Sequence, residues 1–155
     1  STGNKSEIAV GYSTIYGDMA GGFNPLKDVY KTKVYNLCHW RNEMSLDKEN
    51  TKQIIPINIL TKEPSAELAF NQKDSDSLPD YGELDSILEN LIEGDLSLKE
   101  LIDKGFKKDV VLRVQELIYR SEYKRYQSAP GTKISKRPFA LGRRYPLVNQ
   151  WRDKL

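Results

Sequence analysis

The sequence predicts a mostly α-helical chain, and two observations carry that prediction. Apolar residues recur at helical spacing in three successive stretches between Leu78 and Ile118, each bounded by glycine, serine or other polar residues. Period-two alternation of apolar and polar residues, the pattern of half-buried strands, is nearly absent. With 155 residues, 38% of them hydrophobic, the chain is long enough for one domain with a core.

The chain opens with a polar turn that leads into a helix. The turn contains residue types that cap a helix or tighten a backbone turn, namely Thr2, Gly3, Asn4 and Ser6. A helix N-terminus behind such a turn presents unpaired N–H groups that can bind phosphate or another anion. Glu7, in the first turn, either complements the helix dipole or holds a cation that bridges to phosphates. A capped turn without any ligand is the alternative interpretation.

Two helices are expected in the first forty residues. Apolar residues after the turn indicate a first helix that passes Ile15 and ends near Gly17. Asn24 then caps a second helix, with Pro25 at the first helical position, where its missing N–H costs nothing. Apolar spacing extends this second helix to about Trp40.

The middle of the chain is predicted to be mainly loop. Residues 42–53 are polar and unperiodic, and we expect them at the surface. Pro56 starts a short helix, and residues 62–68 follow as an ordered loop. Residues 71–77 resemble a linker in composition, but they are too short to mark a domain boundary.

Three further helices are expected after residue 80. The first carries an apolar stripe over 81–91, and the second covers 97–105. The third covers 109–118 and runs into 121–125, whose cations suit the dipole at its C-terminal end. Beyond residue 131 the chain should be extended and basic, with interspersed prolines and aromatic residues.

Charge is spread unevenly along the chain, although the net charge is only +2. From Tyr119 onward the only acids are Glu122 and Asp153. The bases of this segment are Arg120, Lys124, Arg125, Lys133, Lys136, Arg137, Arg143, Arg144, Arg152 and Lys154. Such asymmetry predicts a basic surface that faces phosphate or an acidic partner.

A single cysteine, Cys38, and a single histidine, His39, exclude a disulfide framework and a structural zinc site. Because adjacent residues point in different directions from a helix, the pair is disfavoured as a nucleophile and base. No apolar run approaches transmembrane length and no signal peptide is recognised, so we expect a cytoplasmic protein without a membrane partner.

Several blocks of the sequence together resemble NAD synthetase. They are residues 2–7 (TGNKSE), 16–26 (YGDMAGGFNPL), 30–35 (YKTKVY), 63–68 (EPSAEL), 76–79 (DSLP) and 119–125 (YRSEYKR). Residues 133–139 (KISKRPF) and 142–146 (GRRYP) are similar to the glutamine-dependent branch. The resemblance covers essentially the whole chain, in order and with compatible spacings.

The resemblance implies ATP-dependent amidation of deamido-NAD to NAD through an adenylylated carboxylate, with release of AMP and pyrophosphate. Ammonia would come from glutamine through a separate glutaminase domain. The implied parent fold is α/β, a Rossmann-like parallel sheet of the adenine nucleotide alpha hydrolase type with flanking helices. ATP and Mg²⁺ are the implied cofactors, and a homo-oligomer is the implied assembly.

The resemblance also assigns site residues. Those that fall at ATP are Thr2, Lys31 and Ser65. Glu7 falls at the metal and at deamido-NAD, and Lys124 falls at deamido-NAD. Asp18 is a further contributor that the resemblance implies at this site. Arg143 and Arg144 are candidates for a structural or interface role. No covalent nucleophile is implied, because the substrate carboxylate and ammonia perform the attacks.

The chain departs from the family pattern in two ways. The ammonia-dependent branch binds deamido-NAD through a lysine and an aspartate at positions that here hold Ile15 and Gly22. The pyrophosphate loop S-G-G-x-D-S and the glutaminase domain have no counterpart in this sequence. We therefore expect residues 1–155 to be the C-terminal portion of a synthetase domain that lacks most of its sheet, and to be inactive in isolation.

Two other classes of function remain open. The chain could be a non-catalytic fragment that mediates oligomerisation or another interaction. A nucleic-acid-binding module, using the basic and aromatic tail over 133–151, is disfavoured because it leaves the first hundred residues unexplained.

Overall fold

The computed structural model describes residues 1–46, 53–65, 70–139 and 141–155. Over these residues the chain is mostly helical, as predicted, and contains isolated β-bridges but no strand. In chain order the elements are α1 (Lys5–Val10), α2 (Lys31–Leu46), α3 (Ile57–Thr61), the 3-10 turn η1 (Asp74–Asp76), α4 (Tyr81–Leu88), the π-helical turn η2 (Glu89–Glu93), α5 (Leu98–Asp103), α6 (Lys108–Arg120) and α7 (Glu122–Gln127). None of the described helices has both the length and the apolar character needed to cross a membrane.

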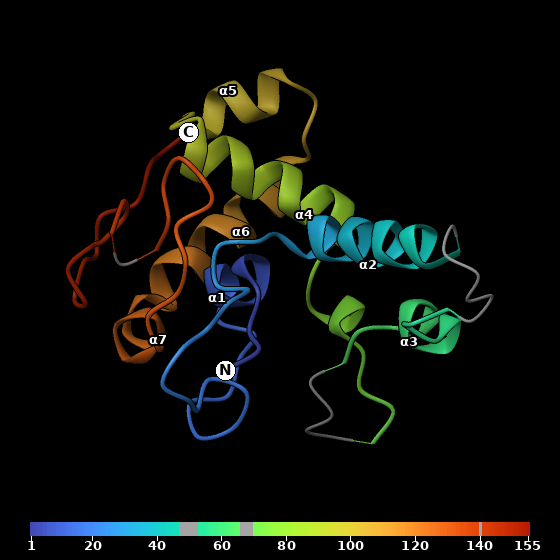
Figure 1. Ribbon diagram of the computed structural model, residues 1–155. Coiled ribbons are helices and arrows are strands. Elements are labelled where there is room, and N and C mark those ends of the chain that lie inside the picture. The colour runs from blue at the N-terminus through green and yellow to red at the C-terminus, as the bar shows by residue number, and fades with distance from the viewer. Residues whose placement is uncertain (47–52, 66–69, 140) are drawn as a thin grey trace.

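The core surrounds α1, which contacts α2, α4, α6 and α7 (Figure 1). The helix is short, but Ile8, Ala9 and Val10 are all buried in it. Much of the remaining core comes from the apolar stripes of α4, α5 and α6, with η2 continuing α4. The stripes predicted over 81–91, 97–105 and 109–118 are therefore confirmed as core-forming helices.

The first helix is shorter than predicted. Asn4 and Glu7 form a reciprocal capping box at its start, and Gly11 ends it in the left-handed conformation, with φ of 74°. A β-carbon at Gly11 would lie 2.2 Å from Ser121 Oγ, so the position requires glycine for packing as well. The expectation that the helix passes Ile15 to Gly17 is wrong, because Gly11 reverses the chain first.

The second helix starts later and ends later than predicted. The Asn24 side chain donates to Gly3 O at 2.8 Å and accepts from Leu26 N, so it fastens a turn instead of capping a helix. The turn also pairs with the tail, since Asn24 N donates to Pro130 O. The helix begins only at Lys31, and it continues to Leu46 through part of the predicted 42–53 loop.

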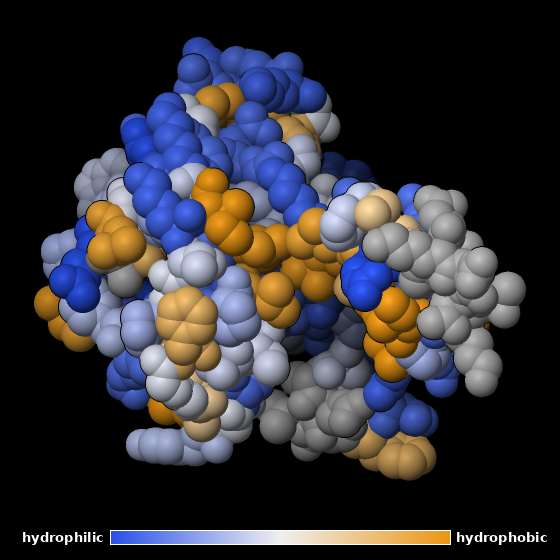
Figure 2. Space-filling view, viewed as in Figure 1, coloured by the Kyte–Doolittle hydropathy of each residue, from blue (hydrophilic) through white to orange (hydrophobic). Residues whose placement is uncertain are grey.

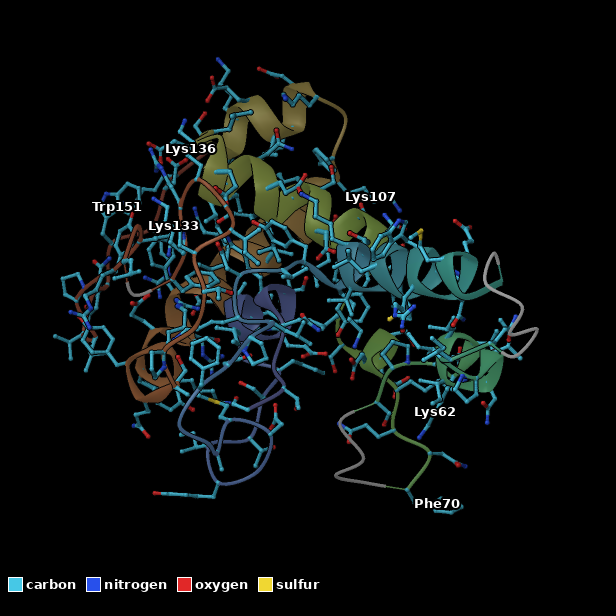
Figure 3. The ribbon with its side chains drawn as sticks, viewed as in Figure 1. Lys62, Phe70, Lys107, Lys133, Lys136 and Trp151 are labelled. Carbon is cyan, nitrogen blue, oxygen red and sulfur yellow. The ribbon has the colours of Figure 1, made fainter. Side chains whose placement is uncertain are left out.

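Predictions for the middle of the chain had mixed outcomes. The short helix after Pro56 is confirmed. Residues 71–77, which looked like a linker, contain η1, and its Asp74 is buried. Part of the ordered loop expected over 62–68 lies outside the described residues. Figure 3 shows Phe70 at the outer end of this segment, and its side chain is exposed.

A buried ammonium group joins four parts of the chain. Lys5 is 0% exposed, and its Nζ donates to Asp28 Oδ1 at 2.7 Å, to Ser135 Oγ at 2.6 Å and to Glu93. It also donates to the carbonyl of Arg137 at 3.1 Å. The α1 helix is thereby tied to the turn before α2, to η2 and to the tail. A buried charge is tolerated only when it is paired and hydrogen-bonded in this way.

Replacing Lys5 with Met should destabilise the fold, because the buried Asp28 carboxylate loses its counter-ion. We expect the free energy of unfolding to fall by about 3–5 kcal/mol. Urea denaturation followed by circular dichroism measures this. The control is Lys33→Met, which breaks the exposed Lys33–Glu89 pair (2.7 Å) and should cost less than about 1 kcal/mol. Equal losses of unfolding free energy in the two variants would contradict the special role of the buried Lys5 network.

Acid should weaken the same network. Burial opposes ionisation of Asp28, but hydrogen bonds from Lys5, Ser135 and Ile134 outweigh it and hold its pKa below 3.8. Since the folded-state pKa is the lower one, the ionised carboxylate adds stability that is present above about pH 3.8 and is lost as the pH falls through the folded-state value. The pKa of Glu93 is likewise held below 4.5, despite burial, by Lys5 and Arg137.

We therefore expect the urea midpoint of the wild-type chain to fall as the pH drops below about 4.5, and Lys5→Met to show a flatter dependence over this range. Parallel slopes for the two proteins would show that Lys5 does not set these pKa values.

Candidate functional site

A cleft of about 770 Å³ lies beside the N-terminal half of the molecule. One wall is the start of the chain with the loop after α1, and the opposite wall is the segment that includes Ser65 and η1 (Figures 1 and 2). Every residue that the resemblance assigned to ligand binding lines this cleft: Thr2, Glu7, Asp18, Lys31, Ser65 and Lys124. The fold thus brings together residues that are far apart in the sequence.

Glu7 and Lys31 form an ion pair on the floor of the cleft. The Lys31 Nζ to Glu7 Oε1 distance is 2.8 Å, and each side chain is 18% exposed. The other oxygen of Glu7 accepts from Asn4 N in the capping box, which fixes the carboxylate. The Lys31 ammonium also lies 5.3 Å from the centre of the Tyr81 ring. Asn4 thus orients the Glu7 carboxylate, and the Tyr81 ring lies beside the Lys31 ammonium. Both side chains remain partly exposed, so a ligand can reach them.

The start of α2 is fastened by a buried carboxylate from α4. Asp85 accepts from Thr32 N at 2.9 Å, from Thr32 Oγ1 at 2.8 Å and from Ser6 Oγ. The Ser6 hydroxyl oxygen in turn accepts from Lys31 N at 2.9 Å. Burial raises the pKa of Asp85, although the hydrogen bonds from Ser6 and Thr32 oppose the shift. These contacts fix the first residues of α2, and they therefore fix the position from which the Lys31 side chain extends into the cleft.

Lys124 enters the cleft from α7, but its ammonium binds the protein. Its Nζ donates to Gly11 O at 2.7 Å and to Ser13 O at 2.8 Å. The neighbouring Arg125 donates to Ala9 O at 2.7 Å, so cations of α7 bind the carbonyls at the end of α1. Lys124 and Arg125 lie in the last turn of α7, as expected, and they also bind carbonyls at the C-terminal end of α1.

Asp18 and Thr2 belong to the rim of the cleft. The Asp18 carboxylate accepts from Thr14 N at 2.6 Å and closes the turn over 14–18. Its backbone carbonyl accepts from Thr2 N at 3.2 Å. Thr2 is exposed, whereas Ser65 on the opposite wall is half-buried. Asp18 therefore shapes the loop that borders the cleft.

The cleft can supply a magnesium ion with one side-chain ligand from Glu7. In the part of the chain that the structure describes, no group of three or more His, Cys, Asp or Glu side chains could hold a metal. Mg²⁺ is commonly bound through one or two carboxylates, with phosphate oxygens and water completing the octahedron. The residues therefore fit a magnesium ion that arrives with a nucleotide.

Sequence reasoning missed Asp74, which lines the cleft, and Tyr81, which binds Asp74. Asp74 lines the cleft from η1 and is only 5% exposed, and its Oδ2 accepts from Tyr81 OH at 2.7 Å. Asp74 was hidden in a polar run that looked like a linker, and Tyr81 was counted among the apolar residues of its helix. The nearby block 76–79 was the available signal, because it placed a family motif two residues beyond Asp74.

The basic tail packs on the protein's own aromatic rings. Arg143 lies 4.3 Å from the Tyr145 ring centre, and Arg144 lies 4.7 Å from that of Tyr126. Arg152 pairs with Glu116 at 2.7 Å. Lys133, Lys136 and Trp151 lie along this segment, on the side of the molecule away from α3 (Figure 3). Arg143 and Arg144 thus make structural contacts and do not line the cleft.

Comparison with known proteins identifies the family. Residues 1–128 match the family of NAD synthase. The chain therefore belongs to the NAD synthase family, and the resemblance noted in its sequence is confirmed. It is 56% identical over 155 residues to the glutamine-dependent NAD(+) synthetase of Rhodobacter capsulatus, covering 99% of this chain and 28% of that protein. It is 55% identical over 152 residues to the same enzyme of Acinetobacter baylyi, covering 98% of this chain and 27% of that protein.

A solved structure shows the same fold. The crystal structure of a glutamine-dependent NAD(+) synthetase from Cytophaga hutchinsonii matches 96% of this chain, with a TM-score of 0.64 and 21% identity. The match covers 24% of that structure's chain. The present chain spans little more than a quarter of the length of the curated relatives it matches.

Replacing Lys124 with Met should loosen the loop after α1, because the carbonyls of Gly11 and Ser13 lose their shared donor. We expect stability to fall by roughly 1–3 kcal/mol and limited proteolysis at 11–18 to become faster. The control is Lys108→Met, at an exposed position on α6, which should change stability by less than about 0.5 kcal/mol. Unchanged protection of the loop in Lys124→Met would show that these contacts do not order it.

Proposed function

We propose that the polypeptide to which this chain belongs catalyses ATP-dependent amidation of deamido-NAD to NAD, with ammonia drawn from glutamine. The observation that carries the proposal is the convergence of all the residues assigned by the resemblance on one cleft. These residues come from the N-terminal turn, α1, α2, the segment before η1 and α7. Chance would not gather such scattered positions at one surface.

The chemistry has two steps. The carboxylate of deamido-NAD attacks the α-phosphorus of ATP, and pyrophosphate leaves. Ammonia then attacks the carbonyl carbon of the acyl adenylate, AMP leaves with the bonding electron pair, and the nitrogen loses a proton. Charge develops around the α-phosphate in the first step, so fixed cations there lower the barrier. Mg²⁺ bound with ATP would neutralise part of that charge.

The cleft residues take roles that fit these steps. We assign Lys31 to the phosphates of ATP, where its ammonium would exchange some of its contact with Glu7 for a phosphate oxygen. Glu7 would then face Mg²⁺ or deamido-NAD. Thr2 and Ser65 would donate hydrogen bonds to ATP. We assign Lys124 to deamido-NAD, with its remaining N–H directed into the cleft, and Asp18 to the loop that borders it.

The remaining parts of the proposal concern the rest of the polypeptide. We infer that residues 1–155 form the C-terminal portion of a Rossmann-like synthetase domain, and that a pyrophosphate loop and a glutaminase domain belong to the same enzyme. Homo-oligomer formation is supported by exposed apolar side chains on α2 and α3. They are Leu37, Trp40, Met44, Ile57 and Ile59.

A turnover assay tests the proposed function. The full polypeptide encoded by the gene should form NAD from deamido-NAD, Mg-ATP and ammonium, whereas the 155-residue chain should show no turnover. Lys31→Met should lower kcat/KM for ATP by about 100-fold or more, because a cation is lost beside the reacting phosphate. Lys33→Met, two residues away and paired with Glu89, should stay within about twofold of wild type.

Two results would contradict the proposal. If the full polypeptide forms no NAD, the assigned activity is wrong. Equal activity losses in Lys31→Met and Lys33→Met would remove the special role of Lys31. A dimer that forms through the α2 and α3 surface without any thermal response to Mg-ATP would favour the non-catalytic interaction fragment instead.

A further inference from the structure

A buried carboxylate oxygen on the wall of the cleft has no hydrogen-bond partner. Asp74 is 5% exposed, and its Oδ2 accepts from Tyr81 OH at 2.7 Å. Its Oδ1 is buried and accepts no hydrogen bond from the described residues. Buried polar oxygens are almost always paired, so an unpaired one requires an explanation. A ligand that occupies the cleft is one explanation that the structure supports.

The backbone around Asp74 is firmly held. Asp74 N donates to Pro64 O at 3.0 Å, and Asp74 O accepts from Ser77 N at 3.1 Å and Leu78 N at 2.9 Å. The Tyr81 hydroxyl then fixes one side-chain oxygen. Burial is the main cause that raises the pKa of Tyr81, and the bond to Asp74 adds to it. The phenol therefore stays protonated and serves as a donor.

Other charged groups of the cleft are already matched by protein groups. Lys31 pairs with Glu7, and the ammonium of Lys124 faces two carbonyls. The Asp18 carboxylate accepts from Thr14 N. Asp74 differs because its second carboxylate oxygen is buried and has no partner among the described residues. Its missing partner must be a donor or a cation, which excludes the phosphate oxygens of a nucleotide.

The partner must also be small. Asp74 Oδ1 is closed to solvent while Tyr81 holds the other oxygen, so a ligand reaches Oδ1 only when the surrounding wall opens slightly. Bulky donors on ribose or adenine would need a larger opening of the wall. Among the substrates of the proposed reaction, ammonia is the small molecule that offers N–H donors, and as ammonium it also carries a positive charge.

We propose that Asp74 binds the nitrogen substrate in the cleft near Glu7 and Lys31, either as ammonia or as ammonium that loses a proton before it attacks. This inference rests on the proposed amidation and adds to it a binding residue for the attacking nitrogen. Tyr81 acts as a positioning residue, because its hydroxyl holds the other oxygen of the same carboxylate.

Kinetics with ammonium as the nitrogen donor test the proposal in the full polypeptide. Asp74→Asn keeps the shape of the side chain and removes its charge. It should raise KM for ammonium by about tenfold or more, while KM for ATP and for deamido-NAD stays within about twofold. Tyr81→Phe should raise the same KM by a smaller factor. Asp76→Asn is the matched control, because Asp76 lies in the same turn but is exposed, and it should leave KM for ammonium unchanged.

Thermal unfolding provides a readout that does not need turnover. Ammonium chloride should raise the melting temperature of the wild-type chain above its value in sodium chloride of equal ionic strength, and Asp74→Asn should abolish that difference. Circular dichroism of each variant shows whether it is folded.

The outcomes separate the two proposals. If the wild-type polypeptide forms no NAD, the proposed function fails, and the thermal comparison alone decides the role of Asp74. If wild type is active and Asp74→Asn leaves KM for ammonium within about twofold, the inference is overturned although the function stands. Similar increases in KM for ammonium, ATP and deamido-NAD would show that Asp74 has only a structural role.

Discussion

The Lys5 ammonium is the interaction on which the rest of the structure depends. It is fully buried and is bound by Asp28, Glu93, Ser135 and the carbonyl of Arg137. These partners come from segments that share no secondary structure with α1. Because a charge without partners could not remain at this depth, the turn before α2, the end of η2 and the tail must all be in place together. The network thus enforces cooperative assembly around a helix of 6 residues.

Both ends of that helix build the cleft. At its N-terminus the capping box holds Glu7 in place, and Glu7 in turn binds Lys31. At its C-terminus Gly11 reverses the chain, and the freed carbonyls are bound by cations of α7, among them Lys124. The stability of the fold and the geometry of the cleft therefore depend on the same helix. A substitution in α1 that disturbs its packing should also displace the groups that line the cleft.

The cleft is preorganised through paired charges. Lys31 and Glu7 form an ion pair, so a ligand phosphate would have to compete with Glu7 for Lys31. The free-energy cost of breaking the pair would be smaller if the released Glu7 carboxylate then bound a metal ion. Asp74 differs from them because one of its oxygens has no partner among the described residues. Such a position is where sequence-level reasoning is expected to fail, since local rules are most often broken at functional or strained sites.

The sequence by itself determined the helical class, the apolar stripes after residue 80 and, through its resemblance to a family, a set of residues that line one cleft. Those features depend on the local spacing of apolar residues and on residue identity, and both can be read directly from the sequence. Tertiary structure decided where α1 ends and where α2 begins, because Gly11 packs against Ser121 and Asn24 pairs with Pro130 across a long stretch of chain. It also decided that the cations of α7 serve α1, and that Asp74, in a run that looked like a linker, lines the cleft. Contacts between residues distant in sequence leave no periodic signal, so only the folded chain reveals them.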